Sequence, residues 1–171
     1  MSELTPPPVA DRPDFPTGYG VPTTSAGVLA WGDVERRLIE ARHYWLATVR
    51  PDGTPHVVPR WGAWLDGRFW YDGAPTTRHA RNLAHNPACS LNLESGTEAV
   101  IVEGRSAPTR ADPDGLGARI AAAFAKYHEL GYAPAADAWA GAEGGGLRVL
   151  TPSRALAWFS FPTDATRFRF P

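Results

Sequence analysis

The chain has 171 residues, of which 43% are hydrophobic, and its formal net charge is −1 at pH 7. A chain of this length is expected to form one domain with a sizeable core. A nearly neutral chain lacks the positive charge with which nucleic-acid and anionic-membrane binders attract their partners, so we expect neither partner. Cys89 is the sole cysteine, which excludes an intramolecular disulfide and a cysteine-rich zinc site.

The first residues, "MSELTPPPVADRPDFP", contain no basic segment followed by an apolar one. No later stretch approaches the roughly 18 apolar residues of a membrane span, so we expect a soluble protein of the cytoplasm. Residues 1–27 are rich in Pro, Thr and Gly and show no sustained periodicity. They predict an extended Pro-rich arm that packs on another element or stays mobile, followed by one domain over residues 28–171.

The first helical pattern lies in "GDVERRLIEARHY". Val34, Leu38 and Ala41 recur at helical spacing, which predicts a helix over residues 33–43 with Asp33 as its N-cap.

Strand patterns fill the next segment, "YWLATVRPDGTPHVVPRWGAWLDGRFWYDG". Its aromatic and β-branched runs are broken at Asp52-Gly53 and at Asp66-Gly67, two tight-turn signals, so we expect three antiparallel strands in a meander. Pro59 falls in the middle strand and cannot donate a ladder hydrogen bond. That strand should therefore be bulged or lie at an edge near Pro59.

The second half of the chain alternates strands with one longer helix. "ACSLNLES" and "EAVIVEGRSAPT" predict a hairpin, and "LRVLTP", "RALAWFSF" and "TRFRFP" predict the last strands. Asp112, followed by a proline, caps a helix with an apolar stripe, and residues 131–146 predict a surface loop. Many short strands with few helices indicate a mainly β fold with accessory helices, built as a closed or partly closed β-barrel.

Several classes of chemistry have no signal in this chain. The nucleophile-elbow, phosphate-loop, dinucleotide and zinc-protease motifs do not occur. The five histidines lack the spacing that places two imidazoles on one metal, so we expect no metal site. They are His43, His56, His79, His85 and His128.

One basic segment, "DGAPTTRHARNLAHNP", predicts a site for an anion. With Thr76 or Thr77 as N-cap, a short helix presents free backbone N–H groups and its positive dipole end beside Arg78 and His79, which suits a phosphate. We expect one helical face to carry the polar residues Arg78, Arg81, Asn82 and His85, and Ala80, Leu83 and Ala84 to face the core. An ordinary amphipathic helix with a solvated basic face is the alternative.

The neighbouring strand "HVVPRWGAW" offers room for a planar ring attached to that phosphate. The ring would lie beside Val58, Pro59, Arg60 and Trp61, where backbone groups freed near the proline could bind its polar edge. The other aromatic residues of this region, Trp45, Trp64 and Trp70, are expected in the core.

Four segments in order resemble the pyridoxamine 5′-phosphate oxidase-like, split-barrel flavin-binding family, with its actinobacterial flavin- or deazaflavin-dependent oxidoreductases as the most similar branch. They are "WLATVRPDGTPHVVPRWGAWLDGRFWY", "TTRHARNLAHNP", "VIVEGRSAPT" and "TDATRFRF". The resemblance covers about residues 30–171. It implies a six-stranded split β-barrel that forms a homodimer with a cofactor in each of two clefts between the subunits.

The same resemblance assigns cofactor contacts to particular residues. It places Thr77, Arg78, Asn82 and Leu83 in the family's phosphate-binding segment, with His79 where a lysine is usual. A neutral histidine is a weaker partner for a phosphate. The ring strand has Arg60 where an aliphatic residue is more common.

The C-terminal strand departs from the family's vitamin B6 oxidases. Those enzymes have Arg-x-His for the substrate phosphate, whereas this chain has Arg167 and Arg169 at these positions, which argues against oxidation of vitamin B6.

The leading functional hypothesis is hydride transfer from reduced coenzyme F-420, an 8-hydroxy-5-deazaflavin, to a small unsaturated organic substrate. Arg60 and Trp61 would line the substrate side, and Arg167 and Arg169 would bind anionic groups such as the coenzyme's acidic tail. An FMN-dependent oxidoreductase is the second hypothesis. A non-catalytic carrier of a flavin, a deazaflavin or haem is the third.

Overall fold

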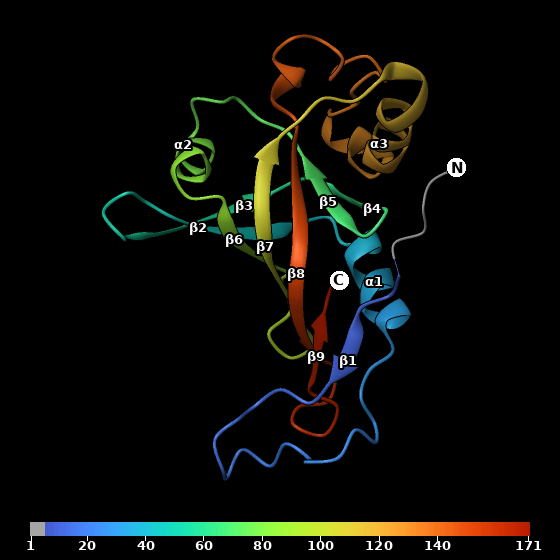
Figure 1. The fold of residues 1–171 in the computed structure, drawn as a ribbon. Helices are drawn as coiled ribbons and strands as arrows, with labels where there is room; N and C mark the ends of the chain where they lie inside the picture. Colours follow the sequence, from blue (N-terminus) through green and yellow to red (C-terminus); the bar gives the residue numbers. More distant parts are fainter. Residues whose placement is uncertain (1–5) are drawn as a thin grey trace.

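A computed structural model describes residues 6–171 of the chain. Its strands form one antiparallel sheet in the order β1-β9-β8-β7-β6-β2-β3, from which the β4–β5 hairpin branches at β8 (Figure 1). The strands are β1 Val9–Asp11, β2 Tyr44–Val49, β3 Pro55–Arg60, β4 Ala63–Leu65, β5 Arg68–Tyr71, β6 Ala88–Asn92, β7 Ala99–Pro108, β8 Arg148–Trp158 and β9 Thr166–Arg169. The α-helices are α1 Trp31–Glu40, α2 Arg78–His85 and α3 Ala118–Ala123. The mainly β class is confirmed; the expected count of six strands is not.

The predicted meander is wrong beyond its first turn. β2 and β3 form a hairpin around Gly53, whose φ is +84°. The next strand, β4, does not pair with β3 but with β5, around Asp66 and Gly67. β5 pairs on its other side with β8. The open edge of β3 agrees with the prediction for a strand that contains Pro59.

The longest ladder joins β7 to β8 through ten residue pairs. The two last strand patterns of the sequence form the single strand β8, whose first residues pair with β5 and whose last residues pair with β9. The register shifts at Glu103 and Gly104. A Cβ at Gly104 would lie 2.2 Å from the carbonyl oxygen of Thr151, so this close crossing requires glycine.

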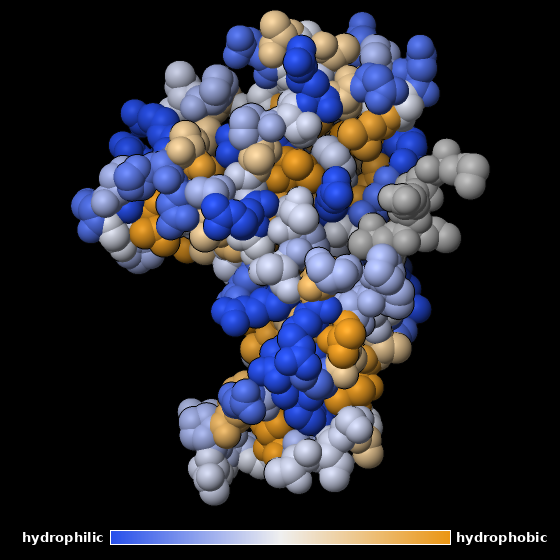
Figure 2. All heavy atoms as spheres, in the orientation of Figure 1, coloured by the Kyte–Doolittle hydropathy of each residue, from blue (hydrophilic) through white to orange (hydrophobic). Residues whose placement is uncertain are grey.

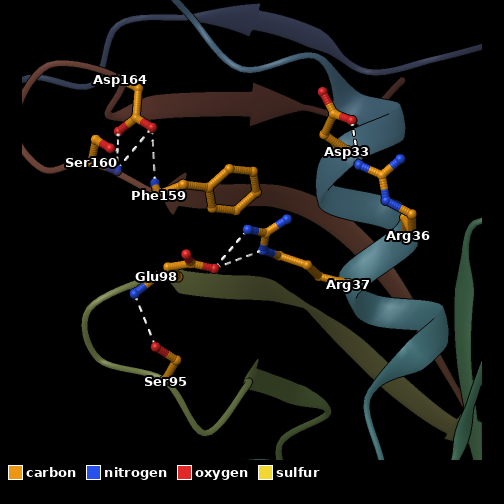
Figure 3. Close-up of polar contacts among 8 residues, drawn as sticks. All are labelled: Asp33, Arg36, Arg37, Ser95, Glu98, Phe159, Ser160 and Asp164. Atoms are coloured by element: carbon orange, nitrogen blue, oxygen red, sulfur yellow. Dashed lines mark hydrogen bonds and ion pairs between the residues drawn. The ribbon is translucent and has the colours of Figure 1, made fainter.

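Helix α1 covers the main core and begins earlier than predicted. Its N-cap is Ala30, and Asp33 lies inside the first turn, where its carboxylate pairs with Arg36 at 2.6 Å. Arg37 extends from the same helix to Glu98 and lies with its guanidinium carbon 3.5 Å from the centre of the Phe159 ring (Figure 3). These contacts connect α1 to the turns that follow β6 and β8.

The second helical region covers the β4–β5 hairpin. Asp112 is the N-cap, as predicted, and its side chain accepts a hydrogen bond from the backbone N–H of Leu116. A π-helical turn at Pro113–Gly117 precedes α3, and 3₁₀ turns follow it at Phe124–Leu130. The predicted apolar stripe is confirmed, because Ile120, Phe124 and Tyr127 are fully buried. None of the helices in the described part of the chain is long and apolar enough to cross a membrane.

The outer face of the sheet bears side chains of two kinds. Hydrophilic groups cover the region around β8 and β9, with hydrophobic groups beside them (Figure 2). Glu103 of β7 and Arg154 of β8 form an exposed ion pair. On the β2–β3 hairpin the outer face is apolar: Trp45, Val49 and Val57 are 37%, 39% and 54% exposed. The prediction that Trp45 lies in the core is therefore wrong, whereas Trp64 and Trp70 are buried as expected.

The described part of the N-terminal arm packs on the domain. β1 adds to the edge of β9, and Asp11 forms ion pairs with both Arg167 and Arg169. Arg12 donates hydrogen bonds to the carbonyl oxygens of Thr24 and Ala165. Of the two expectations for the arm, packing on another element is the one observed.

The Asp11 pair gives a test of the arm's contribution to stability. We expect Asp11→Asn to lower the free energy of unfolding at pH 7 by about 0.5–1 kcal/mol, because the ion pairs are partly exposed. Arg167 and Arg169 hold the pKa of Asp11 below its ordinary value of 3.8, chiefly through the hydrogen bond from Arg167. The contribution is thus present above that pH and is lost as the pH falls below it.

Urea unfolding of the wild type and of Asp11→Asn, at pH 7 and in more acidic buffer, measures the difference between their free energies of unfolding. Asp14→Asn is the matched control, since the Asp14 side chain also lies near Arg167 but is 97% exposed. An equal loss in both buffers would contradict the assignment.

Candidate functional site

The segment between β5 and α2 places the predicted anion-binding residues at the start of the helix. Thr77 occupies the N-cap position, and its hydroxyl lies 3.3 Å from Nε2 of His79 and makes no capping hydrogen bond. Thr76 and Arg78 are exposed. The N-cap side chain therefore does not satisfy the first N–H groups of α2, and the exposed residues Thr76 and Arg78 lie at the same end of the helix.

The predicted faces of α2 need one correction. Asn82 is fully buried and donates from Nδ2 to the Thr48 hydroxyl at 3.0 Å, whereas Ala84 is exposed. Asn82 thus does not share the exposed face with Arg78, Arg81 and His85. Its Oδ1 is buried and has no hydrogen-bond partner in the described structure. Helical spacing assigned Asn82 to the polar face, whereas its contact with Thr48 on β2 turns it toward the core.

His79 belongs to the first turn of α2, and its side chain is buried, with only 4% exposed. Burial, followed by the nearby charges of Arg60 and Arg148, lowers the pKa of His79 from 6.5 to about 4. The imidazole is therefore neutral at pH 7. It faces the ring of Tyr71, with the two ring centres 6.2 Å apart.

Of the four residues predicted to lie along a ring, the three on β3 divide between its two sides and Trp61 follows the strand. Val58 and Arg60 lie opposite Leu46 and Tyr44, whose side chains are buried, whereas Pro59 is exposed on the other face. Arg60 donates to the main-chain oxygen of Asp72, and its pKa is lowered by burial. This bond brings the end of β3 alongside the segment that leads into α2.

Trp61 continues from β3 into a cluster of aromatic rings. It stacks on Tyr127 with ring centres 5.1 Å apart and lies 5.9 Å from Tyr132. The hydroxyl of Tyr127 also bonds to the backbone of Gly62, which fixes the turn that follows Trp61.

The segment 131–146 is more than the predicted surface loop. Trp139 is 1% exposed, and its indole N–H donates to the carboxylate of Asp72 at 2.8 Å. The Tyr132 hydroxyl donates to the same carboxylate oxygen. Gly146 has a φ of +74°, and a Cβ there would lie 2.1 Å from the carbonyl oxygen of Gly73. Sequence reasoning missed Asp72, which follows a strand without any motif of its own.

Within one chain, Arg167 and Arg169 do not lie beside α2. They lie on β9, near the opposite end of the strand order from β3, and both pair with Asp11. Within residues 6–171, no group of three or more His, Cys, Asp or Glu side chains could hold a metal ion.

Comparison with known proteins decides the family. The chain matches the family "Pyridoxamine 5′-phosphate oxidase" over residues 32–159, which is most of its length. The chain belongs to this family. The match includes β2 to β8 and both segments of the candidate site. A search of curated proteins finds no match.

Solved structures with this fold include a protein of unassigned function, a reductase and a haem-binding protein. Protein Rv2991 from Mycobacterium tuberculosis, a conserved hypothetical protein, has a TM-score of 0.58 and 21% identity over 78% of this chain and 87% of its own. An F-420 reductase has a TM-score of 0.50 and 23% identity over 70% and 94%. A haem-binding protein from Mycobacterium smegmatis has a TM-score of 0.55 and 23% identity over 79% and 57%. These similarities show a common fold.

The burial of His79 predicts how the chain responds to acid. The unfolded chain should take up a proton on this residue near pH 6.5, whereas the folded chain resists protonation until about pH 4. The free energy of unfolding should therefore decrease as the pH falls through this window. NMR titration of the imidazole measures its pKa directly. His79→Gln should remove this part of the slope, and a change of equal size in the exposed control His85→Gln would contradict the assignment.

Proposed function

We propose that this member of the family is an oxidoreductase that binds a phosphorylated deazaflavin or flavin at the start of α2 and along β3. With reduced coenzyme F-420, it would transfer a hydride to a small unsaturated organic substrate. The observation that supports this most directly is the Arg60–Asp72 bond, because it holds the end of β3 beside the uncapped start of α2. A phosphate and its attached ring could then contact both elements.

The residues present fit such a cofactor. Thr77, Arg78 and the first N–H groups of α2 suit the phosphate. Buried Nε of Arg60 and Oδ1 of Asn82 lack hydrogen-bond partners, which is uncommon unless a ligand or water completes the site. The unpaired edge of β3 offers backbone groups beside Val58 and Pro59.

A bound deazaflavin or flavin supplies the two-electron chemistry, and the protein binds, orients and shields it. Trp61, held against Tyr127, would form a wall of the substrate side. The Arg60 guanidinium, 5.8 Å from the centre of the Tyr71 ring, would keep positive charge next to that wall.

A second candidate function is binding without catalysis. The haem-binding protein from Mycobacterium smegmatis has at least as high a TM-score with this chain as the F-420 reductase does. A carrier of a flavin, deazaflavin or haem would use the same fold. Visible spectra of the purified protein with each compound, followed by turnover assays, separate the candidates: oxidoreductase activity requires turnover with a reductant.

Arg78 provides the main test of the phosphate site. We expect Arg78→Ala to weaken binding of FMN or coenzyme F-420 by about 1.5–3 kcal/mol, the magnitude of a charged hydrogen bond. Since Arg78 is exposed and forms no ion pair among the described residues, the melting temperature of the ligand-free protein should hardly change. Titration of each cofactor into the wild type and the variant measures the effect.

Arg81→Ala is the matched control, because Arg81 is also exposed on α2 but lies one turn further from its start. Equal affinities for wild type, Arg78→Ala and Arg81→Ala would mean that the basic face is only solvated surface.

We also propose that the site is completed in a homodimer. In one chain, the edge of β3 and the apolar outer face of the β2–β3 hairpin are open to water. Trp45 lies opposite Pro59 and Val57 lies opposite Ala47 on these adjacent strands, and none of the four is charged. A second copy would cover this face and close the cleft next to β3.

Light scattering at micromolar concentration should therefore give the mass of a dimer. Trp45→Glu should shift the protein toward monomer, because a buried carboxylate without a partner is costly. If the wild type is a monomer, the proposal that a second copy completes the site next to β3 is wrong.

A further inference from the structure

Arg148 is a buried guanidinium that the proposed function does not use. It is the first residue of β8, pairs across the ladder with Tyr71 and is 8% exposed. One terminal nitrogen donates to the main-chain oxygen of Ser106 at 3.4 Å, a long hydrogen bond. Its Nε is buried without a hydrogen-bond partner in the described structure.

No carboxylate balances this charge. Among the ion pairs of residues 6–171, none includes Arg148 or Arg60. The negative charge of Asp72, whose carboxylate accepts hydrogen bonds from Tyr132 and Trp139, acts on Arg60, so Arg148 is the less compensated of the two arginines. Buried charges in proteins are normally paired or bind a ligand of opposite charge.

The groups around Arg148 leave the positive charge in place. His79 is neutral, and burial raises the pKa of the Cys89 thiol to about 12 and that of Tyr71 above its ordinary value. None of these three groups is therefore an anion at pH 7.

Tyr71 connects the two arginines in space. Its ring centre lies 5.8 Å from the Arg60 guanidinium carbon and 6.2 Å from the centre of the His79 ring. Its hydroxyl lies 2.7 Å from the hydroxyl of Ser106, the residue to whose carbonyl Arg148 donates. Arg60 and Arg148 thus lie around one buried ring, beneath the first turn of α2 that bears His79.

We propose that Arg60 and Arg148 form an inner anion-binding pair that takes the phosphoryl group of the cofactor from beneath α2. This inference rests on the proposed function, in which that group binds at the start of the same helix. Thr77, Arg78 and the helix N–H groups contact the phosphoryl group from the solvent side. The two buried guanidiniums contribute charge from the protein side, with Arg148 supplying the charge that no carboxylate neutralises.

The experiment compares FMN with riboflavin, which has the same ring but no phosphate. We expect the wild type to prefer FMN, and Arg148→Met and Arg60→Met each to reduce the ratio of the two affinities by about tenfold or more, as for loss of a charge-assisted hydrogen bond. Any loss of contact with the flavin ring should weaken both ligands to the same extent, so the ratio of the two affinities reports the contact with the phosphate alone. Arg68→Met is the matched control, because Arg68 is exposed on β5, the strand of Tyr71.

A purely structural role for Arg148 predicts a different result. Arg148→Met would then lower the melting temperature of the ligand-free protein and leave the ratio of FMN to riboflavin affinity as in the wild type, which would overturn the proposal. If Arg148→Met does not fold, Arg60→Met decides by the same ratio.

Inorganic phosphate separates this inference from the proposed function. Phosphate should raise the melting temperature of the ligand-free wild type more than chloride at equal ionic strength, and the gain should shrink in both methionine variants. A wild type that binds neither cofactor would overturn the proposed function, and the phosphate measurement would still decide for or against the arginine pair. If the wild type binds FMN and both variants keep the wild-type ratio of FMN to riboflavin affinity, the arginine pair would be overturned and the proposed function would stand.

Discussion

The pairing of β7 with β8 is the constraint on which the rest of the structure depends. The first residues of β8 pair with β5 and its last residues pair with β9, while β7 pairs on its other side with β6. The change of register at Gly104 lets β8 run from one set of partners to the other, and only a residue without a Cβ fits there. The hairpin that leads into α2 and the strand that holds the N-terminal arm are both attached to this one strand.

This arrangement also explains the unusual electrostatics beneath α2. Because β5 pairs with the first residues of β8, Tyr71 and Arg148 are neighbours, and His79 of α2 lies against the Tyr71 ring. The sheet supplies hydrogen bonds to the backbone here, but no acidic side chain for the guanidinium. Such a cluster costs free energy in the empty protein, and sites that bind charged ligands commonly combine buried groups in this way. Binding of an anion there, as proposed, would therefore stabilise this region.

Short sequence patterns correctly predicted turns, caps and a strand edge, whereas the environments of other residues depend on contacts distant in the sequence. The proline in β3, the two Asp-Gly turns, the Asp112 cap and the Thr77 position all depend on a few neighbouring residues, and the structure agrees with each. Asn82 and Trp45 were misplaced because their environments depend on β2 and on the open sheet face. Arg148 and Asp72 had no motif, since their significance comes from partners many residues away. The arm's pairing with β9 likewise joins the two ends of the chain.

The attachment of segment 131–146 has a consequence for how this protein can change. The segment is fixed to the lead into α2 by two aromatic donors, Tyr132 and Trp139, and by the close contact of Gly146 with Gly73. Between the two aromatic residues the sequence is "APAADA", with small side chains that are exposed or half-buried. Insertions and deletions there would change the length of this stretch, while Tyr132, Trp139 and Gly146 keep their contacts. Chains of this fold can therefore differ in the segment next to Trp61 while keeping the same sheet beneath it.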